Sequence, residues 1–490
     1  MSKQLFIDPN EMRKPGKVTF TDIPVNVYQK TVKDEKKNFS KEQLVTIYRD
    51  MLILREFETM INLIKKTGEY EGVAYNHPGP AHLSMGQEAT AVGCAFHLDA
   101  NDFIFGSHRA HSDILAKGLS AIEKLSDDEL MSIMKNFLGG KTLKVVEKIG
   151  HENVSDMAID FLLYGAMAEI FARETGFNGG LGGSMHTFFT PFGIYPNNAI
   201  VGGSGTIAMG ASLYKRVNRK PGIVLANIGD GSLGRGPVLE ALNMAGMGQL
   251  TKLWDADMRG GLPVLFNIIN NQYGMGGQTN GETMAYDILA RLGAGFNPNQ
   301  MHAERVDGFN PLAVIEAMGR KKEILLKGEG PVLLDVLTYR FAGHSPSDSS
   351  SYRTKEEIEA WEAQDPIIEY RKQLLEAKVA TAKELDQTVA FVKDSIMKNF
   401  KLSIDDSISP RMNLEANPDE IADMMFTNGH VESFGGDTKP DVLMPMEENP
   451  RVQAIAKKER FGIDASGKPV SKNKVYQLRD GLFEAIIERV

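Results

Sequence analysis

The sequence predicts an α/β protein built on a parallel sheet with helices on both faces. Two short runs, residues 223–228 and 263–269, are apolar or β-branched and bounded by glycine and proline, as buried parallel strands are. A helical segment separates the runs, and each run is followed directly by a polar motif that contains glycine. Because ligands bind at the carboxyl ends of the strands in open α/β sheets, we expect the functional site there.

The composition is that of a globular protein with an excess of acidic residues. The chain has 490 residues, of which 42% are hydrophobic and 24% charged, and its formal net charge is −9. This length suggests two or three domains, or one large α/β domain with additions. The negative charge argues against a general nucleic-acid binder, and no apolar run approaches the roughly 18 residues that span a membrane. We expect neither nucleic acid nor a membrane as a partner.

Cysteine usage and the N-terminal residues indicate a reducing compartment. The one cysteine, Cys94, cannot form an internal disulfide or a thiolate metal cluster, and its apolar neighbours indicate a packing role. The N-terminus shows no apolar signal core, and its mixture of lysine, aspartate and glutamate is unlike a transit peptide. We expect a cytoplasmic protein.

The chain is expected to begin with an extended arm, residues 1–40, which is polar and carries three prolines. Ser40 and Gln43 form a capping-box pattern, so a long helix is expected to follow, with an apolar face over residues 44–54. This helix opens the main domain, which we place at residues 41–428.

Two motifs follow in the first half of this domain. Residues 82–89, which include His82, enter an apolar helix. A short strand at 102–105 then runs into a loop with His108 and Arg109. Arginine grips phosphate bidentately and histidine can donate to it, although a solvated loop is an equal alternative for these residues taken alone.

A mostly helical stretch and a glycine cluster come next. Residues 126–170 mix acidic and basic residues, and we expect them to be largely helical. Residues 176–186 contain six glycines in eleven positions. So many glycines indicate backbone that takes positive φ and approaches a ligand closely.

The two central motifs together predict a magnesium site. Gly229-Asp230-Gly231-Ser232 follows the first strand, and residues 270–276 follow the second. A carboxylate, an amide oxygen and a backbone carbonyl are hard donors that suit Mg²⁺. Either motif alone is more often an ordinary turn, but both follow strands, in order, which favours the site.

The last third of the chain predicts a strand, helices and a linker. A strand at 331–338 ends in a loop that holds His344; a lone loop histidine is usually solvated, but this one follows a strand end. Residues 352–402 are expected to be mostly helical. Proline and glycine then mark an extended linker, 429–474, and an amphipathic helix begins in 475–490.

These motifs, in this order, resemble the alpha subunit of the thiamine diphosphate-dependent first component of 2-oxo acid dehydrogenases, the family of pyruvate, branched-chain 2-oxo acid and acetoin dehydrogenase alpha subunits. The resemblance covers about residues 44–426. It implies a thiamine diphosphate-binding fold with Mg²⁺ held by Asp230, Asn271 and the Tyr273 carbonyl. It further implies His82 and His344 as catalytic residues that face the reacting carbon.

The resemblance also implies a set of cofactor contacts. The diphosphate would meet the first motif and the basic loop, and backbone around 199–201 would hold the aminopyrimidine, with Val201 keeping the cofactor bent. Many relatives have tyrosine where this chain has His108. The implied cofactor-binding residues are His108, Arg109, Ala199, Val201, Gly229, Gly231, Ser232, Asn271 and Ser345.

The implied reaction is oxidative decarboxylation of a 2-oxo acid with acyl transfer to a lipoyl group on a partner acyltransferase. An acetoin-cleaving dehydrogenase subunit and a non-catalytic cofactor-binding subunit are the alternatives. A nucleotide-binding Rossmann enzyme fits less well, because the glycine cluster does not directly follow a clear strand with an acidic residue about 20 positions on.

The resemblance also sets expectations about partners. A beta-type subunit or domain would complete the active site, in a heterotetramer or a dimer of fusions, and residues 475–490 resemble the start of such a beta part. Compared with the family, residues 126–170 are expected to be a helical insertion, and the segment 248–261 is expected to loop out before the second central strand. Pro80 and Ala81 stand where relatives often have bulkier residues, which predicts an acyl pocket wider than one for pyruvate.

Overall fold

The computed structural model describes residues 6–256 and 258–424, together with 448, 450, 453–454, 466, 478–479 and 481–482. The chain divides into two units, Met1–Met412 and Asn413–Val490. All predicted site residues lie in the first unit, and the second contains the short helix α17 (Glu420–Met424). The predicted linker and the beta-like segment fall almost entirely outside the described residues.

A five-stranded sheet organises the first unit. Its strand order is β3-β4-β5-β7-β6, and every neighbouring pair is parallel. The sequence predicts four of these strands but misses β6, three of whose four residues are charged. The strands are β3 (Phe103–Phe105), β4 (Val224–Gly229), β5 (Val264–Asn270), β6 (Glu304–Asp307) and β7 (Val332–Leu337).

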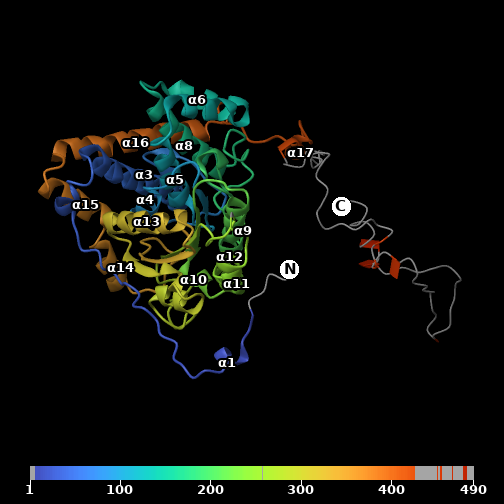
Figure 1. Cartoon of the computed structure of the whole chain (residues 1–490). Helices are drawn as coiled ribbons and strands as arrows, with labels where there is room; N and C mark the ends of the chain where they lie inside the picture. Colours follow the sequence, from blue (N-terminus) through green and yellow to red (C-terminus); the bar gives the residue numbers. More distant parts are fainter. Residues whose placement is uncertain are drawn as a thin grey trace. The chain divides into compact units, whose positions relative to one another are not determined.

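Helices cover both faces of this sheet, as predicted (Figure 1). Side chains alternate between the two faces of a strand, and here they feed two separate cores. Leu225 and Leu265 join a core with helices α3, α4, α5, α8, α13 and α16. Ala226 and Phe266 join a second core with α9 and α11. The strands are therefore buried on both sides, which explains their continuous apolar sequences.

The long helices begin where local sequence signals place them. In the capping box of α3, Ser40 Oγ accepts from the Gln43 N–H at 3.1 Å and Gln43 Oε1 accepts from the Ser40 N–H at 2.9 Å. The predicted helical stretch 126–170 is confirmed as α6, α7 and α8. The larger helices are α3 (Lys41–Lys66), α4 (Glu88–Ala95), α5 (His111–Ile122), α6 (Asp127–Asn136), α7 (Lys141–Val146), α8 (Val154–Ile170), α9 (Gly203–Val217), α11 (Gly236–Ala245), α13 (Pro311–Leu326), α14 (Lys355–Glu362), α15 (Pro366–Glu376) and α16 (Ala382–Ile404).

Short elements complete the first unit. The N-terminal arm is largely exposed and joins the sheet edge through one bridge, Val25 to Arg305. The predicted loop at 248–261 begins with a short helix and then turns. Cys94 is buried, and its Sγ accepts from Asn267 Nδ2 at 3.3 Å, which fits a packing thiol. The remaining short elements are α1 (Pro9–Met12), α2 (Val32–Glu35), α10 (Asp230–Leu233), α12 (Gly248–Lys252), β1 (Glu69–Tyr70) and β2 (Val73–Ala74).

In the part of the chain that the structure describes, no helix combines the length and the apolar character that crossing a bilayer requires.

Candidate active site

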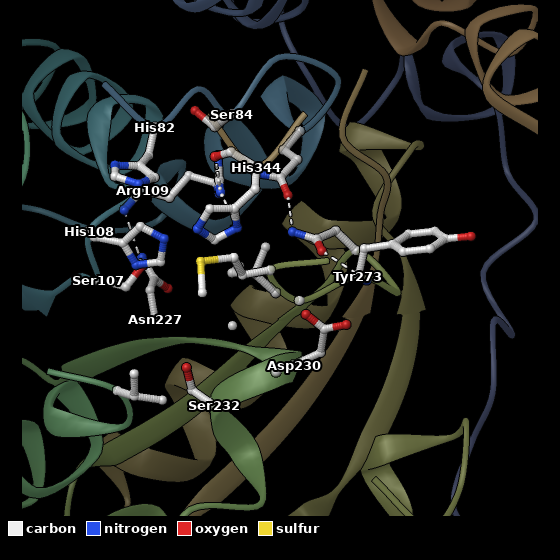
Figure 2. Close-up of a pocket in the computed structure, with 18 of the residues that line it drawn as sticks. His82, Ser84, Ser107, His108, Arg109, Asn227, Asp230, Ser232, Tyr273 and His344 are labelled. Atoms are coloured by element: carbon white, nitrogen blue, oxygen red, sulfur yellow. Dashed lines mark hydrogen bonds between the residues drawn. The ribbon is translucent and has the colours of Figure 1, made fainter. Parts of the chain in front are cut away.

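A cavity of about 500 Å³ lies where the carboxyl ends of β3, β4, β5 and β7 meet (Figure 2). This volume falls in the range of small-molecule sites. Segments that follow these four strands, and the loops before α4 and α9, supply its walls. The predicted site residues that line it are His82, His108, Arg109, Ala199, Val201, Gly229, Asp230, Gly231, Ser232, Asn271, Tyr273 and His344.

One predicted cofactor contact lies elsewhere. Ser345 does not line this cavity but an adjoining one, which it shares with His344 and Met275. Its hydroxyl lies 3.1 Å from that of Ser347. His344 lines both cavities, whereas Ser345 lines the adjoining one.

Asp230 supplies a buried carboxylate at the end of β4. Its Oδ2 accepts a hydrogen bond from Thr279 Oγ1 at 2.7 Å. Burial raises the pKa of Asp230 to about 6, against the lowering effect of that bond. The buried carboxylate has lost its favourable interaction with water, so its negative charge is costly without a counter-ion. A cation bound beside it replaces that interaction, and the cavity therefore favours a cation here.

Asn271 presents an oxygen to the same space from the end of β5. Its Nδ2 donates to Gln87 Oε1 at 2.9 Å, while its Oδ1 accepts from the Tyr273 N–H at 3.3 Å. The preceding Asn270 has a structural role instead, since its Nδ2 donates to Asp335 Oδ1 at 2.8 Å. Of the two asparagines, Asn271 therefore belongs to the cavity.

The side chain of Tyr273 is anchored away from the cavity, and Figure 2 shows its ring pointing outward. Its hydroxyl donates to Glu357 at 2.8 Å, and the Tyr339 hydroxyl donates to the same carboxylate at 2.9 Å. Glu357 lies in the first turn of α14. The helix that follows the His344 loop thus holds the turn that carries the Tyr273 carbonyl.

Arg109 spans the opposite wall. Its Nη1 donates to the Leu83 carbonyl at 2.6 Å and its Nη2 donates to the His344 carbonyl at 2.8 Å. Burial and the nearby Arg340 lower the pKa of Arg109 to about 9, so it remains a cation at neutral pH. It also joins the 82–89 motif to the His344 loop.

Three histidines converge beside Arg109. The ring centroids of His82 and His108 are 4.6 Å apart, those of His82 and His344 5.3 Å, and those of His108 and His344 5.4 Å. Burial, and then Arg109, lower their pKa values to about 4, 3 and 3 for His82, His108 and His344. At neutral pH each ring is uncharged and donates through one nitrogen.

The cavity has two regions of different charge. The three histidines and Arg109 favour an anion, and the oxygens of Asp230 and Asn271 favour a cation. Three imidazoles also suit a transition metal, and their nitrogens lie within 4.8 Å of one another. However, Arg109 and Arg340 lower the histidine pKa values, and the same positive field repels a dication. Buried His82 Nδ1 and His108 Nε2 have no hydrogen-bond partner, as expected where a ligand supplies one.

Figure 2 shows the two regions on opposite sides of the cavity, with the histidines and Arg109 facing Asp230 and Ser232. A ligand that carries a diphosphate, together with a hard cation, matches this separation. The residues present therefore fit a magnesium–diphosphate group.

The glycine-rich segment has a different partner from the predicted ligand. The carboxylate of Glu169 accepts backbone N–H bonds of 2.5–3.2 Å from Asn178, Gly180, Gly182 and Gly183. The glycines thus let the backbone come close to a buried side chain of α8. Of residues 176–186, Met185 alone lines the cavity.

Several cavity residues were not predicted from the sequence. Gln87 belongs to the 82–89 motif and could have been found there. Asp113 follows the basic loop closely, whereas Asn227 lies inside a strand. Thr279, which does not line the cavity but binds Asp230, lies in a loop without any sequence signal. Long-range contacts, which a sequence does not display, bring these groups to the site.

The comparisons with known proteins agree with this geometry. A family model described as "Dehydrogenase E1 component" matches residues 67–158 and 150–410. The pyruvate dehydrogenase E1 component subunit alpha of Rhizobium meliloti is 31% identical over 73% of this chain and 84% of its own length. The protein of the same name from Porphyra purpurea is 30% identical over 77% and 92%. The mitochondrial one from Schizosaccharomyces pombe is 28% identical over 86% and 85%.

Proposed function

The chain belongs to the dehydrogenase E1 component family, as an alpha-type member of the 2-oxo acid dehydrogenases, and we propose that it decarboxylates a 2-oxo acid oxidatively. The acyl unit would pass to a lipoyl group on a partner acyltransferase. The observation that carries the proposal is one cavity that combines the oxygen donors of Asp230 and Asn271 with Arg109 and three histidines.

We propose that Asp230, Asn271 and the Tyr273 carbonyl hold Mg²⁺. His108 and Arg109, with the backbone of Gly231 and Ser232, would bind the diphosphate. Support comes from the donor types, since hard oxygens suit Mg²⁺ and a guanidinium suits phosphate. Thiamine diphosphate, when bound, supplies the electron sink that loss of CO₂ from a 2-oxo acid requires.

The chain's own catalytic groups would be His82 and His344. Because both imidazoles are neutral at physiological pH, each can donate one N–H to a developing negative charge on the substrate oxygen. Arg109 positions His344 by binding its backbone carbonyl. Ala199 and Val201, in the loop before α9, would contact the aminopyrimidine, and this assignment rests on the resemblance.

A beta-type subunit or domain would complete the site. Val201 and Met275 line the cavity, yet these residues are 57% and 82% exposed. Large apolar residues exposed at a cavity mouth indicate a surface that a partner covers. Among the residues that the structure describes, no glutamate lines the cavity, so a glutamate that acts on the aminopyrimidine would come from that partner.

Pyruvate is the first substrate to test, because the relatives are named pyruvate dehydrogenase. The predicted widening of the acyl pocket rested on Pro80 and Ala81. Neither residue lines the cavity, so the structure offers no support for a wider pocket at these positions.

The test is reduction of an artificial electron acceptor by the chain assembled with its beta-type partner. Pyruvate, branched 2-oxo acids and acetoin are compared, each with and without thiamine diphosphate and Mg²⁺. We expect cofactor-dependent turnover of a 2-oxo acid, its loss in Asp230→Asn, and its retention in Asp386→Asn, a substitution of an exposed carboxylate. Turnover of acetoin alone would favour the cleaving enzyme, and no turnover with any substrate would indicate a non-catalytic subunit.

A further inference from the structure

Asp113 is an acidic residue of the cavity that the proposed function leaves without a role. It lies in the first turn of α5 and lines the cavity together with Asn227 and Thr90. Its side chain is only partly exposed. Because Asp113 borders the cavity, a ligand that fills this space displaces the water that reaches its carboxyl group.

The surroundings of Asp113 offer little compensation for a negative charge. Among the described residues, no lysine, arginine or histidine forms an ion pair with it. Asn227, which lines the cavity beside it, is the polar side chain that most favours its charged form. Asn227 Oδ1 already accepts from Asn267 Nδ2 at 2.8 Å, so Asn227 can favour a negative charge on Asp113 only through its Nδ2. Burial raises the pKa of Asp113 to about 7, despite Asn227 and His111.

The other ionisable groups around Asp113 do not replace a counter-ion. Glu58 of α3 is already paired with His111 of α5 at 3.1 Å. The thiol of Cys94 on α4 has a pKa raised to about 12 by burial, so it is neutral. On α8, Glu169 is occupied by backbone N–H groups. The remaining charged or titratable groups belong to the cavity itself and are Asp230, His82, His108, Arg109, Arg235, Tyr273 and His344.

We propose that Asp113 is a further ligand-contacting residue, which takes up a proton when thiamine diphosphate binds and then donates a hydrogen bond to the bound anion. This inference rests on the proposed function. An anion in the cavity removes water from the carboxyl group and adds a like charge, and both effects favour the neutral acid. A protonated carboxyl carries one O–H donor, whereas a carboxylate only accepts.

Proton uptake is measurable apart from activity. The assembly of this chain with its beta-type partner, freed of cofactor, is titrated calorimetrically at pH 7.5 with the preformed magnesium–thiamine diphosphate complex. Titrations in phosphate, Hepes and Tris, which differ in ionisation enthalpy, yield the number of protons exchanged. We expect the wild type to take up about 0.5–0.8 proton per site. We also expect its affinity to fall by up to about tenfold per pH unit between pH 7 and 9.

The variant Asp113→Asn isolates the source of the proton. Its amide is nearly the same size and can donate to an anion at any pH, so we expect proton uptake near zero and an affinity that no longer depends on pH in this range. The histidines are the competing source, because an anion also raises their pKa values. We therefore expect His108→Asn to weaken binding but to keep the proton uptake.

The outcomes separate the inference from the proposed function. If the cofactor binds but the wild type takes up no proton, or Asp113→Asn takes up as many as the wild type, the inference is wrong and the proposed function stands. If proton uptake disappears in His108→Asn and persists in Asp113→Asn, the proton belongs to the histidines. This result also overturns the inference about Asp113. If the wild-type assembly does not bind the cofactor at all, both fail.

Discussion

Replacing Gln87 should weaken divalent-metal binding although Gln87 is not a proposed metal ligand. Its Oε1 accepts from Asn271 Nδ2 at 2.9 Å, and this bond fixes which side of the Asn271 amide carries the nitrogen and which the oxygen. Gln87→Met keeps the length of the side chain but removes the acceptor. Without it, the Asn271 amide can rotate and present nitrogen instead of oxygen to the metal.

The magnitude follows from the one hydrogen bond that the substitution removes. A buried neutral hydrogen bond contributes about 0.5–1.5 kcal/mol, and 1.4 kcal/mol corresponds to a tenfold change in affinity. We therefore expect Gln87→Met to raise the Kd for the metal by about 2- to 12-fold. Gln87→Glu keeps the acceptor and adds a negative charge near the cation, so its Kd should equal or fall below that of the wild type.

The assay is a titration with Mn²⁺, followed by its electron paramagnetic resonance signal, in the assembly at fixed thiamine diphosphate. Thr142→Val is the matched control, because it removes a buried hydroxyl that donates to the Thr175 carbonyl at 2.8 Å, outside the cavity. It should lower stability without changing the Kd. Equal Mn²⁺ affinity in Gln87→Met and the wild type would refute the idea that Gln87 orients Asn271.

Three further predictions concern groups that support the site. Glu357→Ala removes the acceptor shared by the hydroxyls of Tyr273 and Tyr339, so Mn²⁺ binding should weaken severalfold. Glu357→Gln should recover part of the affinity. Unchanged affinity in the alanine variant would contradict this prediction. Glu169→Ala leaves four backbone N–H groups without their acceptor. The free energy of unfolding, measured with denaturant, should fall by about 3–5 kcal/mol. A fall of less than about 1 kcal/mol would exclude this role of Glu169. Burial raises the pKa of Asp230 from 3.8 to about 6, so the penalty on the metal-free fold grows between these two pH values and is fully present above them. Asp230→Asn should then stabilise the metal-free chain by about 3 kcal/mol at pH 7.5, with the gain vanishing toward pH 4. A gain that is independent of pH would argue against this cause.

Much of the fold can be derived from local sequence. Four strands are apolar runs bounded by glycine or proline, and α3 begins at its Ser40–Gln43 capping box. The strand β6 escapes this reasoning, because its charged residues are satisfied by distant partners, such as Arg305 Nε with Asp335 Oδ2 at 2.8 Å. Propensity and periodicity describe near neighbours and carry no information about such pairs.

The sequence also determined where the site would be. Parallel strands end at one edge of a sheet, so polar motifs that follow β3, β4, β5 and β7 must meet there, and twelve of the thirteen predicted site residues line one cavity. Ser345 is the exception: it follows His344 directly in the chain but lines the adjoining cavity.

Only the tertiary structure decided how the groups at that edge are used. The Asn271 amide is oriented by Gln87, which is 184 positions away in the chain, and the Tyr273 hydroxyl is held by Glu357. The glycine cluster, which the sequence assigns to a ligand, wraps the carboxylate of Glu169 instead. Side-chain partners and pKa values depend on distance, burial and neighbouring charge in three dimensions, whereas a sequence displays only the order of the residues.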